Sequence, residues 1–389
     1  MKFTEQLYDL IPCSSSADIQ WDKIDPLFSG ICFSAMKDTP QNPVYHGEGD
    51  VYTHMQMVCR ELAADPDFYT LSDRHKEELF LAALLHDIGK VKTTRLENSV
   101  WSSPHHSLTG SQIVRTFLWR DCGLCGTMEN IVFRETVCSL VRYHMLPVNL
   151  IDRNDPEKIA RETAAAAELA ADFSWYLLCM LSKADVKGRI SDNIENALEQ
   201  IRLAELAAED AECFHCPYPF KDSFTGYAYL SGRNVAADQI LFDDTWGEVI
   251  MISGLPGTGK DTWIRQHNSE MPVISLDDIR KKMCIGHGDP QGAVIRTSQE
   301  QARIFLRKKQ PFIWNATDLT KDLRQKLVRF FEQYKARVRI IYLETDWNKR
   351  AERNLGRDNA VPESAVNKML EMTVLPSPDE AQAVEWRCV

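Results

Sequence analysis

The first half of the chain carries apolar residues at helical intervals. From residue 21 to about residue 208 they recur mostly every three or four positions, the spacing of one face of an α-helix. Breaks rich in proline and aspartate, such as residues 64–66 and 153–156, separate these stretches. The pattern predicts an all-α helical bundle, whose clearest helical stretches are residues 77–85, 111–119, 134–143 and 173–184.

The second half changes to short, unbroken apolar runs separated by helix-like stretches. These runs are residues 249–252, 272–276, 311–314 and 338–343. Such alternation is typical of an α/β domain in which crossover helices join the strands of a parallel sheet. The sequence between the halves is irregular, and we interpret it as a connector with one or two short strands. The predicted organisation is multi-domain, with a helical domain over residues 22–208, a connector over 209–246 and an α/β domain over 247–389.

Composition and charge fit two ordinary folded domains. The chain has 389 residues, of which 44% are hydrophobic, enough for two packed cores. Its net charge of −11 argues against a protein that coats nucleic acid without specificity. The charge is divided unevenly, with a net of −15 over residues 1–245 and +4 over residues 246–389. An acidic first half suits metal-binding carboxylates, and a basic second half suits a polyanionic substrate.

No segment predicts export or membrane insertion. The first ten residues include Glu5 and Asp9 and lack the apolar run of a signal peptide, and no stretch reaches the roughly 18 apolar residues of a membrane span. Eleven cysteines are scattered along the chain, as is typical of free thiols in a reducing compartment. Cys213 and Cys216 flank His215, but no second pair lies at zinc-finger spacing, so we interpret them as structural. We expect a cytoplasmic protein.

Histidine and aspartate residues near the ends of the predicted helices indicate a metal site. His86 and Asp87 are adjacent at the end of the helical stretch that begins near Asp73. Side chains from separate helices of a bundle can meet at one interior point, and imidazole with carboxylate suits Zn, Mn, Fe, Co or Ni. The further candidates lie in other helical stretches: His54, His106 or its neighbour His105, His144 and Asp185.

The order of these residues resembles the HD phosphohydrolase superfamily across about residues 40–205. The resemblance implies hydrolysis of a phosphoester with one or two divalent metal ions. His106 is preferred to His105 because it stands four residues before Gly110, where the family places its ligand. Lys90 would bind a phosphate oxygen, while His46 either faces the phosphate or caps the following helix. The implied ligands are His54, His86, Asp87 and Asp185 for a first ion, with His106 and His144 for a second.

A glycine-rich loop follows the first apolar run of the second half. Its context of strand, loop and helix is that of a P-loop, in which backbone N–H groups hold the phosphates of ATP and Lys260 reaches the β- and γ-phosphates. Asp261 replaces the usual Ser or Thr ligand of Mg²⁺ and Thr262 follows it, so the sequence leaves open which of the two approaches Mg²⁺. The residues predicted to bind ATP are Gly254, Pro256, Gly257, Thr258, Gly259, Lys260, Asp261 and Thr262.

Further polar residues follow the P-loop. Asp277 and Arg280 come after the second apolar run, three positions apart on one helical face. With the P-loop, this pair resembles the polynucleotide kinase branch of P-loop phosphotransferases, which implies that Asp277 accepts a proton from a 5′-hydroxyl and that Arg280 binds a phosphate. Arg350, Arg353 and Arg357 look like an arginine lid over ATP, with Arg357 and then Arg353 as catalytic candidates. Residues 315–317, Asn-Ala-Thr, form either a polar triplet of the site or a plain turn.

The order of the two predicted domains resembles bacterial HD-Pnk end-healing enzymes. The resemblance implies that the first domain removes a 2′,3′-cyclic, 2′- or 3′-phosphate from RNA or DNA. The second would transfer the γ-phosphate of ATP to a 5′-hydroxyl with Mg²⁺, leaving ends that suit a coupled RNA ligase. Two alternatives stay open: a nucleotide phosphohydrolase fused to a small-metabolite kinase, and an ATP-gated switch without catalysis. The sequence does not indicate the oligomeric state.

Overall fold

The computed structural model describes residues 3–14, 18–267, 270–286, 288–357 and 360–389. The chain divides into two compact units, and each is described by itself. Unit 1 comprises Met1–Leu124 and Glu129–Tyr218, and unit 2 comprises Cys125–Met128 and Pro219–Val389. Among the described residues, none of the helices combines the length and the apolar composition needed to cross a membrane.

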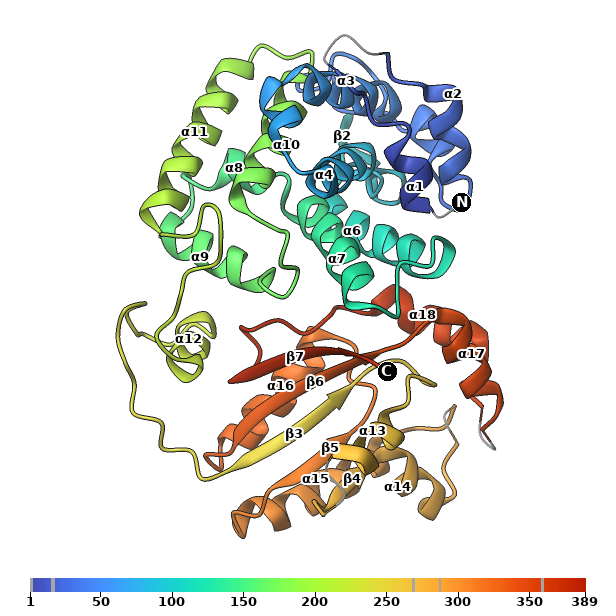
Figure 1. The fold of residues 1–389 in the computed structure, drawn as a ribbon, viewed down its shortest axis with the longest axis vertical. Coiled ribbons are helices and arrows are strands. Elements are labelled where there is room, and N and C mark those ends of the chain that lie inside the picture. Colours follow the sequence, from blue (N-terminus) through green and yellow to red (C-terminus); the bar gives the residue numbers. More distant parts are fainter. Residues whose placement is uncertain (1–2, 15–17, 268–269, 287, 358–359) are drawn as a thin grey trace. The chain divides into compact units, whose positions relative to one another are not determined.

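Unit 1 is built from helices, as predicted for this half of the chain (Figure 1). Its α-helices are α1 (Phe3–Tyr8), α2 (Trp21–Ile24), α3 (Val51–Ala64), α4 (Asp73–Leu85), α5 (Lys90–Thr93), α6 (His106–Thr116), α7 (Met128–Tyr143), α8 (Leu146–Asn149), α9 (Pro156–Ala166), α10 (Trp175–Lys187) and α11 (Ile194–Asp210). The shorter turns are η1 (Asp25–Phe28), η2 (Ser34–Asp38), η3 (Pro66–Thr70) and the π-helical η4 (Phe117–Asp121).

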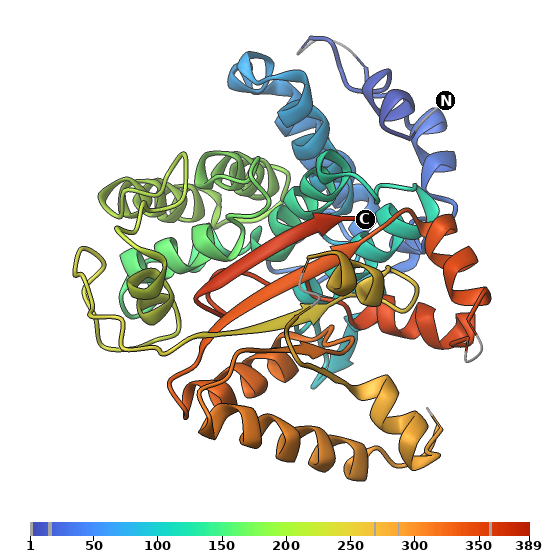
Figure 2. The same cartoon turned by 60° about the horizontal axis from the view of Figure 1, so that its bottom comes forward.

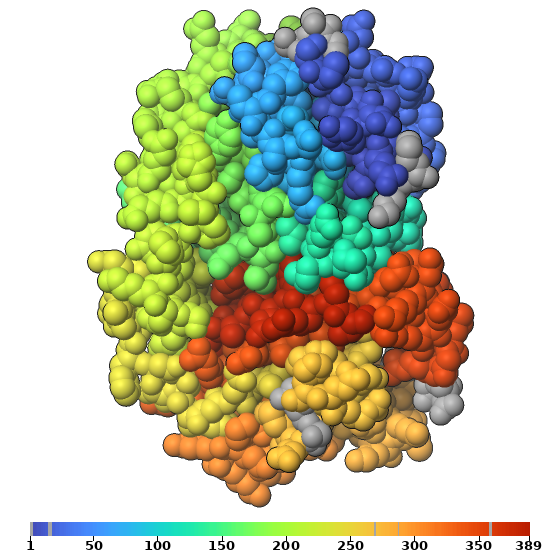
Figure 3. All heavy atoms as spheres, in the orientation of Figure 1, coloured from blue at the N-terminus to red at the C-terminus, as the bar shows by residue number. Residues whose placement is uncertain are grey.

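Side-chain hydrogen bonds mark where the central helices begin. Asp50 accepts from the backbone N–H of Thr53 at the start of α3, and Ser72 and Ser174 cap α4 and α10 in the same way. Every residue of α4 from position 78 onward is buried, because this helix runs through the middle of the unit. Buried residues of α3, α4 and α10 belong to one hydrophobic core. The space-filling view shows atoms closely packed over the outer face of unit 1 (Figure 3). The ends of α3, α4 and α10 are thereby held firmly in a packed core.

One small hairpin departs from the all-α prediction for unit 1. Strands β1 (Arg95–Glu97) and β2 (Val100–Ser102) pair in antiparallel fashion. Asn98 and Ser99 join them with positive φ angles of 49° and 62°, the conformation of a two-residue type I′ turn. The strands have three residues each and are largely exposed. They are too short and too polar in their surroundings to produce an alternating hydrophobic pattern, so the sequence did not predict them.

Unit 2 contains a five-stranded, all-parallel sheet in the order β4-β5-β3-β6-β7. Strands β3 (Glu248–Ser253), β4 (Val273–Ser275), β5 (Phe312–Asn315) and β6 (Arg337–Glu344) correspond to the four predicted runs, whereas β7 (Ala383–Cys388) was not predicted. The helices are α13 (Lys260–His267), α14 (Leu276–Met283), α15 (Gly292–Arg307), α16 (Lys321–Glu332), α17 (Trp347–Leu355) and α18 (Glu363–Met372).

Both faces of this sheet are covered by helices. Along β3, Val249 and Met251 join a core with residues of α15 and α16, while Ile250 and Ile252 join a core with Ile264 of α13. Figure 2 shows α15 and α16 on one face of the sheet. Burial on both faces explains why β3 is an unbroken apolar run. The loop after β3 lies where neighbouring strands β5 and β6 diverge to opposite sides, the usual place for a ligand in such sheets.

The segment interpreted as a connector contains a helix where short strands were expected. Helix α12 (Ser223–Leu230) begins at the Asp222 carboxylate, which accepts from the backbone N–H of Thr225. All of its residues from Phe224 to Leu230 are buried. Because the helix has no exposed polar face, its sequence lacks the three- to four-residue alternation that predicts a helix. No strand lies among the described residues between α11 and β3.

Candidate metal centre and nucleotide pocket

Five segments of unit 1 bring six of the predicted side chains together. His54 lies on α3 and Asp185 on α10, while His86 and Asp87 form the turn that follows α4. His106 is the first residue of α6, and His144 directly follows α7. All of them are at most 1% exposed except His106, whose side chain is 17% exposed. His105, the alternative to His106, is exposed and has no place in the cluster.

Asp87 lies at the centre of the cluster, with one carboxylate oxygen toward each half. Its Oδ2 lies 3.3 Å from Nε2 of His86 and 3.7 Å from Nε2 of His54, and the latter nitrogen is 3.0 Å from Oδ1 of Asp185. Its Oδ1 lies 3.4 Å from Nε2 of His106 and 3.8 Å from Nε2 of His144. Two neighbouring ligand sets therefore share Asp87, whereas the resemblance implies Asp87 for the first ion only.

The backbone fixes which nitrogen of each histidine faces the centre. His86, His106 and His144 each donate Nδ1–H to the carbonyl oxygen three residues earlier, over 2.8, 2.9 and 2.8 Å. His54 makes the corresponding bond to Gly188 over 3.1 Å. A carbonyl oxygen can only accept, so the proton is on Nδ1, which leaves Nε2 of His86, His106 and His144 with a lone pair. Nε2 of His54 instead lies within hydrogen-bond distance of Asp185, at 3.0 Å. All four rings thus present Nε2 as a metal ligand would.

Two buried atoms of the cluster lack a protein partner. His86 Nε2 and Asp87 Oδ1 make no hydrogen bond to any described residue. Buried polar atoms are normally paired, so these two call for a bound group. A nitrogen lone pair and a carboxylate oxygen are donors that divalent transition metals accept, and two sets of at least three such donors lie here within 4.8 Å of one another. The residues fit one or two metal ions.

The charges around the cluster suit cation binding. Burial raises the pKa of Asp87, but the ammonium group of Lys90 and the imidazole of His86 beside it outweigh that effect, and the pKa ends well below its usual range. Asp185 is similar, with Arg189 and His54 overcoming the effect of burial. Burial lowers the pKa of His144 to about 3. Both carboxylates are therefore ionised and His144 is neutral at physiological pH, which are the forms that bind metal.

Two glycines let the ligand-bearing segments approach closely. A Cβ atom on Gly89 would lie 2.0 Å from the carbonyl oxygen of His106 and 2.6 Å from the backbone nitrogen of Gly110. A side chain at Gly110 would in turn meet Val141 on α7 at 3.3 Å. The first turn of α6, which carries His106, can therefore lie directly on the turn that carries His86 and Asp87 only because position 89 is glycine, and Gly110 avoids a tight contact with α7.

Three residues beside the cluster were given no role from the sequence. Glu48, whose side chain is 1% exposed, has a carboxylate oxygen 2.9 Å from Nδ1 of His54 and 2.8 Å from Nδ1 of His46. Arg189 forms an ion pair of 2.5 Å with Asp185, four positions earlier, a spacing that could have suggested it. Gln41 accepts a 2.7 Å hydrogen bond from Lys90, which also pairs with Asp87 over 2.7 Å. No sequence pattern pointed to Gln41.

A cavity of about 440 Å³ opens onto the cluster. Asp87, His106 and Asp185 reach it from the metal side, and Lys90, Arg189 and His46 line it as well. The basic side chains of Lys90 and Arg189 thus border the space in front of the candidate metal ligands. Trp101 from the unpredicted hairpin lies in the wall. This arrangement suits an anionic substrate such as a phosphate ester.

In unit 2, the predicted P-loop wraps around its own lysine. Lys260 donates from Nζ to the carbonyl oxygens of Gly254 and Leu255, over 2.8 and 3.0 Å. Burial lowers the pKa of Lys260 to about 8, although Asp277 and Asp261 act in the opposite direction. Gly257 has φ of +87°, and a Cβ there would lie 2.4 Å from the carbonyl oxygen of Arg350. Only glycine allows this loop to pass so close to α17.

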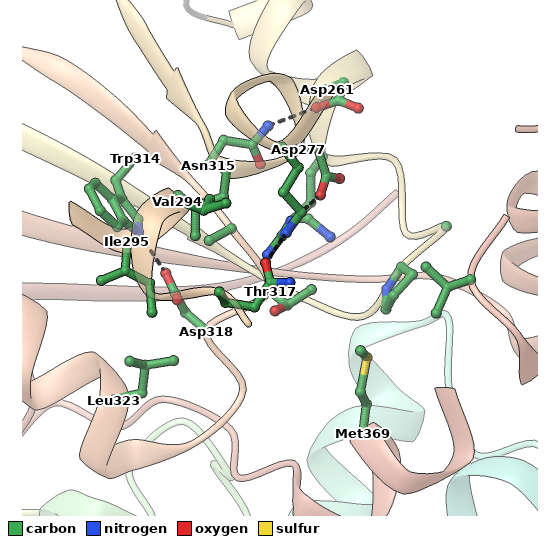
Figure 4. Close-up of a pocket in the computed structure, with 18 of the residues that line it drawn as sticks. Asp261, Asp277, Val294, Ile295, Trp314, Asn315, Thr317, Asp318, Leu323 and Met369 are labelled. Atoms are coloured by element: carbon green, nitrogen blue, oxygen red, sulfur yellow. Dashed lines mark hydrogen bonds and ion pairs between the residues drawn. The ribbon is translucent and has the colours of Figure 1, made fainter. Parts of the chain in front are cut away.

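The two candidates for the usual Mg²⁺ ligand face different partners. Asp261 accepts a 2.7 Å hydrogen bond from Nδ2 of Asn315 at the end of β5, and Figure 4 shows the two side chains pointing toward one another. The hydroxyl of Thr262 accepts from Arg265 on the same helix, over 3.1 Å. Asn315 therefore belongs to the pocket, which favours the polar-triplet interpretation of residues 315–317 over a plain turn.

The acid–arginine pair lies in the same pocket as the P-loop. Arg280 donates to Asp277 over 2.5 Å and to Gln291 over 2.8 Å. Nη2 of Arg357 lies 3.4 Å from Asp277 and 4.0 Å from Asp261. The cavity measures about 700 Å³ and includes Lys260, so one space holds the predicted base, the predicted ATP-binding lysine and an arginine between two carboxylates.

The arginines predicted as a lid separate into two groups. Arg353 lies in the pocket wall and donates to the carbonyl oxygen of Thr258 over 3.3 Å. Arg350, by contrast, is 1% exposed, pairs with Glu363 over 2.6 Å and lies over the ring of Trp347. The expectation that all three share one side therefore fails for Arg350. Helix α17 ends at Leu355, so Arg357 lies beyond the helix and its direction does not follow from helical spacing.

Comparison with known families gives two matches. Residues 51–172 match the HD domain family, and residues 249–376 match a family described as an AAA domain. The chain thus joins an HD domain to a P-loop α/β domain.

The matched ranges cover most of the candidate residues. The HD match includes His54, His86, Asp87, His106 and His144, whereas Asp185 lies beyond its end. The AAA match contains every predicted ATP-binding residue as well as Asp277, Arg280 and Arg357. Together the two matches support a phosphohydrolase combined with a P-loop kinase-like domain.

The far side of the P-loop pocket is apolar. Val294 and Ile295 of α15 and Leu323 of α16 line it (Figure 4). Trp314 donates from Nε1 to Asp318 over 3.0 Å, and burial raises the pKa of Asp318 to about 7. A flat apolar group the size of a nucleobase would find contacts on this wall.

Proposed function

We propose that this protein heals nucleic-acid ends, with RNA as the principal substrate. Its HD domain would hydrolyse a 2′,3′-cyclic, 2′- or 3′-terminal phosphate, and its P-loop domain would phosphorylate a 5′-hydroxyl with ATP. The observation that carries the kinase half is that Asp277 lies in one open pocket with Lys260 and Arg357. The order of the two domains resembles that of bacterial end-healing enzymes, which supports the proposal that both activities act on one nucleic-acid substrate.

In the HD domain, six residues would hold the metal ions: His54, His86, Asp87, His106, His144 and Asp185. The ions would bind the phosphate oxygens and activate a water for attack on phosphorus. The protein itself supplies Lys90 and Arg189, whose positive charges border the cavity and would bind the remaining phosphate oxygens. Hydrolysis breaks the phosphorus–oxygen bond to the ribose and leaves a hydroxyl there.

In the P-loop domain, Asp277 would accept the proton of the 5′-hydroxyl as its oxygen attacks the γ-phosphorus of ATP. A new oxygen–phosphorus bond forms, the bond between the β,γ-bridging oxygen and the γ-phosphorus breaks, and ADP leaves. Lys260, Arg357 and Arg353 would neutralise the charge that spreads over the transferring group, and Arg280 would bind a substrate phosphate. The apolar wall of the same pocket suits the base of the terminal nucleotide.

The test uses an RNA that carries a 5′-hydroxyl and a 2′,3′-cyclic phosphate, with labelled ATP. We expect both ends to change in the presence of Mn²⁺ or Mg²⁺. Asp87→Ala should abolish only the 3′-end reaction, and Asp277→Ala should abolish only the 5′-end reaction. No change at either end would contradict end healing, and loss of both reactions in either variant would contradict two separate sites.

A small-metabolite kinase would use the same aspartate, so chain length provides the discriminating measurement. We expect kcat/KM for 5′-phosphorylation to rise from a nucleoside to an oligonucleotide, because Arg280 would bind a phosphate that the nucleoside lacks. Equal values for both would favour the small-molecule alternative. The DNA version of each oligonucleotide gives the preference for the 2′-hydroxyl in the same assay.

A further inference from the structure

In the P-loop pocket, the acidic residue has exchanged places with a neutral one. P-loop enzymes generally hold Mg²⁺ between a Ser or Thr after the P-loop lysine and an Asp at the end of the adjacent strand. Here Asp261 follows Lys260, and Asn315 stands at the end of β5, the strand that pairs with β3. The single carboxylate of the pair has therefore moved from the strand to the helix, and the neutral side chain stands on the strand.

The two side chains are arranged as a ligand and its orienting partner. Nδ2 of Asn315 donates to Oδ1 of Asp261 over 2.7 Å, which fixes the carboxylate and leaves Oδ2 directed into the pocket. That oxygen is 4.0 Å from the guanidinium of Arg357. Asp261 is 59% exposed and thus open to an ion arriving with ATP.

Asn315 carries a second, independent sign of a missing partner. Its side chain is 7% exposed, and its Oδ1 makes no hydrogen bond to any described residue. Reversing the amide would place Oδ1 against the Asp261 carboxylate, so the observed orientation is the favourable one. A buried acceptor in this position suits a water of a hydrated Mg²⁺ ion, since Mg²⁺ usually keeps several of its waters.

Three other oxygen-bearing side chains of the pocket accept hydrogen bonds from basic or indole groups. Asp277 accepts from Arg280, and Asp318 accepts from Trp314. The Thr262 hydroxyl accepts from Arg265. We therefore propose that Asp261 is the protein ligand of the Mg²⁺ that accompanies ATP and that Asn315 positions it, a reversed form of the usual pair. The inference rests on the proposed use of ATP but not on the nature of the acceptor.

Nucleotide binding tests the proposal without any acceptor. Calorimetric titration of the full-length protein with ATP, in excess Mg²⁺ and in EDTA, gives the factor by which Mg²⁺ strengthens ATP binding. We expect Asn315→Ala to reduce this factor by about tenfold, as is common for residues that orient a ligand, and Asp261→Ala to reduce it further. Asp278→Ala removes an exposed carboxylate from α14 that is outside the pocket and should leave the factor unchanged.

The decisive variant exchanges the two residues. Asp261→Ser combined with Asn315→Asp restores the usual pair, and we expect it to regain a Mg²⁺ effect that each single change loses. Asn315→Asp alone sets two carboxylates in contact and should weaken binding of ATP in EDTA. The proposal is overturned if Asp261→Ala keeps the wild-type factor, if Thr262→Ala removes it instead, or if the double variant gains nothing over the single ones.

Failure of this proposal is distinguishable from failure of end healing. Wild-type protein that binds ATP with the expected Mg²⁺ dependence but phosphorylates no RNA would refute the kinase substrate and leave the metal ligand intact. Protein that phosphorylates RNA with an unchanged Mg²⁺ factor in Asp261→Ala would refute only the reversed pair. Thermal melting of each variant shows whether a lost effect reflects a lost fold.

Discussion

In the HD domain the candidate ligands are held inside the core, whereas in the P-loop domain the candidate catalytic residues face open solvent. His54, His86 and Asp87 are at most 1% exposed, and each histidine is locked by a backbone carbonyl. Asp277 and Asp261 are 53% and 59% exposed. The hydrolytic site is therefore organised by folding, while the kinase site depends on ATP and the acceptor to complete it. Substitutions should accordingly act through metal occupancy in one domain and through turnover in the other.

The largest expected effect is from Asp87→Asn, since Asp87 is common to both ligand sets. An amide keeps the size but loses the charge, so both ions should be lost, and metal affinity should fall by more than the roughly 10–100-fold that is typical when only a partner of a ligand is changed. Metal content by mass spectrometry should approach zero and 3′-phosphate hydrolysis should fall to background, while kinase activity persists. His144→Ala, which touches only the second set, should retain one ion. Full metal content in Asp87→Asn would show that Asp87 is not a ligand shared by two ions.

Asp277→Asn should lower kcat for 5′-phosphorylation by about 10²–10⁴-fold, the usual contribution of a general base. ATP affinity should change little, because Asp277 is proposed to act on the acceptor. Asp278→Asn is the matched control, since it makes the same change at the next residue of α14, outside the pocket. If kcat is unchanged while KM for ATP rises, Asp277 belongs to nucleotide binding instead.

Glu48→Gln tests how far the organisation of the HD site extends. The side chain keeps its size but loses the charge that faces Nδ1 of His54, so metal affinity should fall by roughly 10–100-fold without loss of the fold. Titration with Mn²⁺ measures it, and Glu97→Gln on the exposed hairpin serves as control. Unchanged affinity would mean that the Gly188 carbonyl alone holds His54 in place.

The smallest effect concerns the pH dependence of ATP binding. The pKa of Lys260 is about 8 in the free protein, and bound phosphates favour the charged form and raise it. ATP affinity should thus be level below pH 8 and fall about tenfold per pH unit above it, until the pKa of the complex is reached. Calorimetry across that range checks it. A constant affinity up to pH 10 would mean that Lys260 stays charged throughout.

The sequence predicted the metal cluster better than its surroundings. Histidine and aspartate are typical metal ligands, and those at the ends of the predicted helices lie together in one cluster of the structure. Glu48 and Gln41 could not be found in the same way, because their importance comes from contacts with His54 and Lys90 across the fold. A carboxylate or amide on a loop has no local pattern that reveals such a partner.

Strands were predictable where both faces are buried and missed where one is exposed. Strand β7 alternates charged with apolar residues, as in Glu385, Trp386 and Arg387, so it lacks the unbroken apolar run of β3. The arginine lid shows a related limit. The spacing of Arg350 and Arg353 predicted that both side chains face the pocket. The spacing could not predict that Arg350 forms an ion pair with Glu363 outside the pocket.

The hydrogen bonds from His86, His106 and His144 to the carbonyl three residues earlier have a consequence for how such sites change over time. Each ring is aimed by the path of the main chain, so the two residues between a carbonyl and its histidine are free to vary as long as they pack. Adding or deleting one residue there would turn the ring away from Asp87. Distant relatives of this domain should therefore keep the spacing between each carbonyl and its histidine even where sequence identity is low. A search for this spacing should detect such relatives better than a search for identical residues.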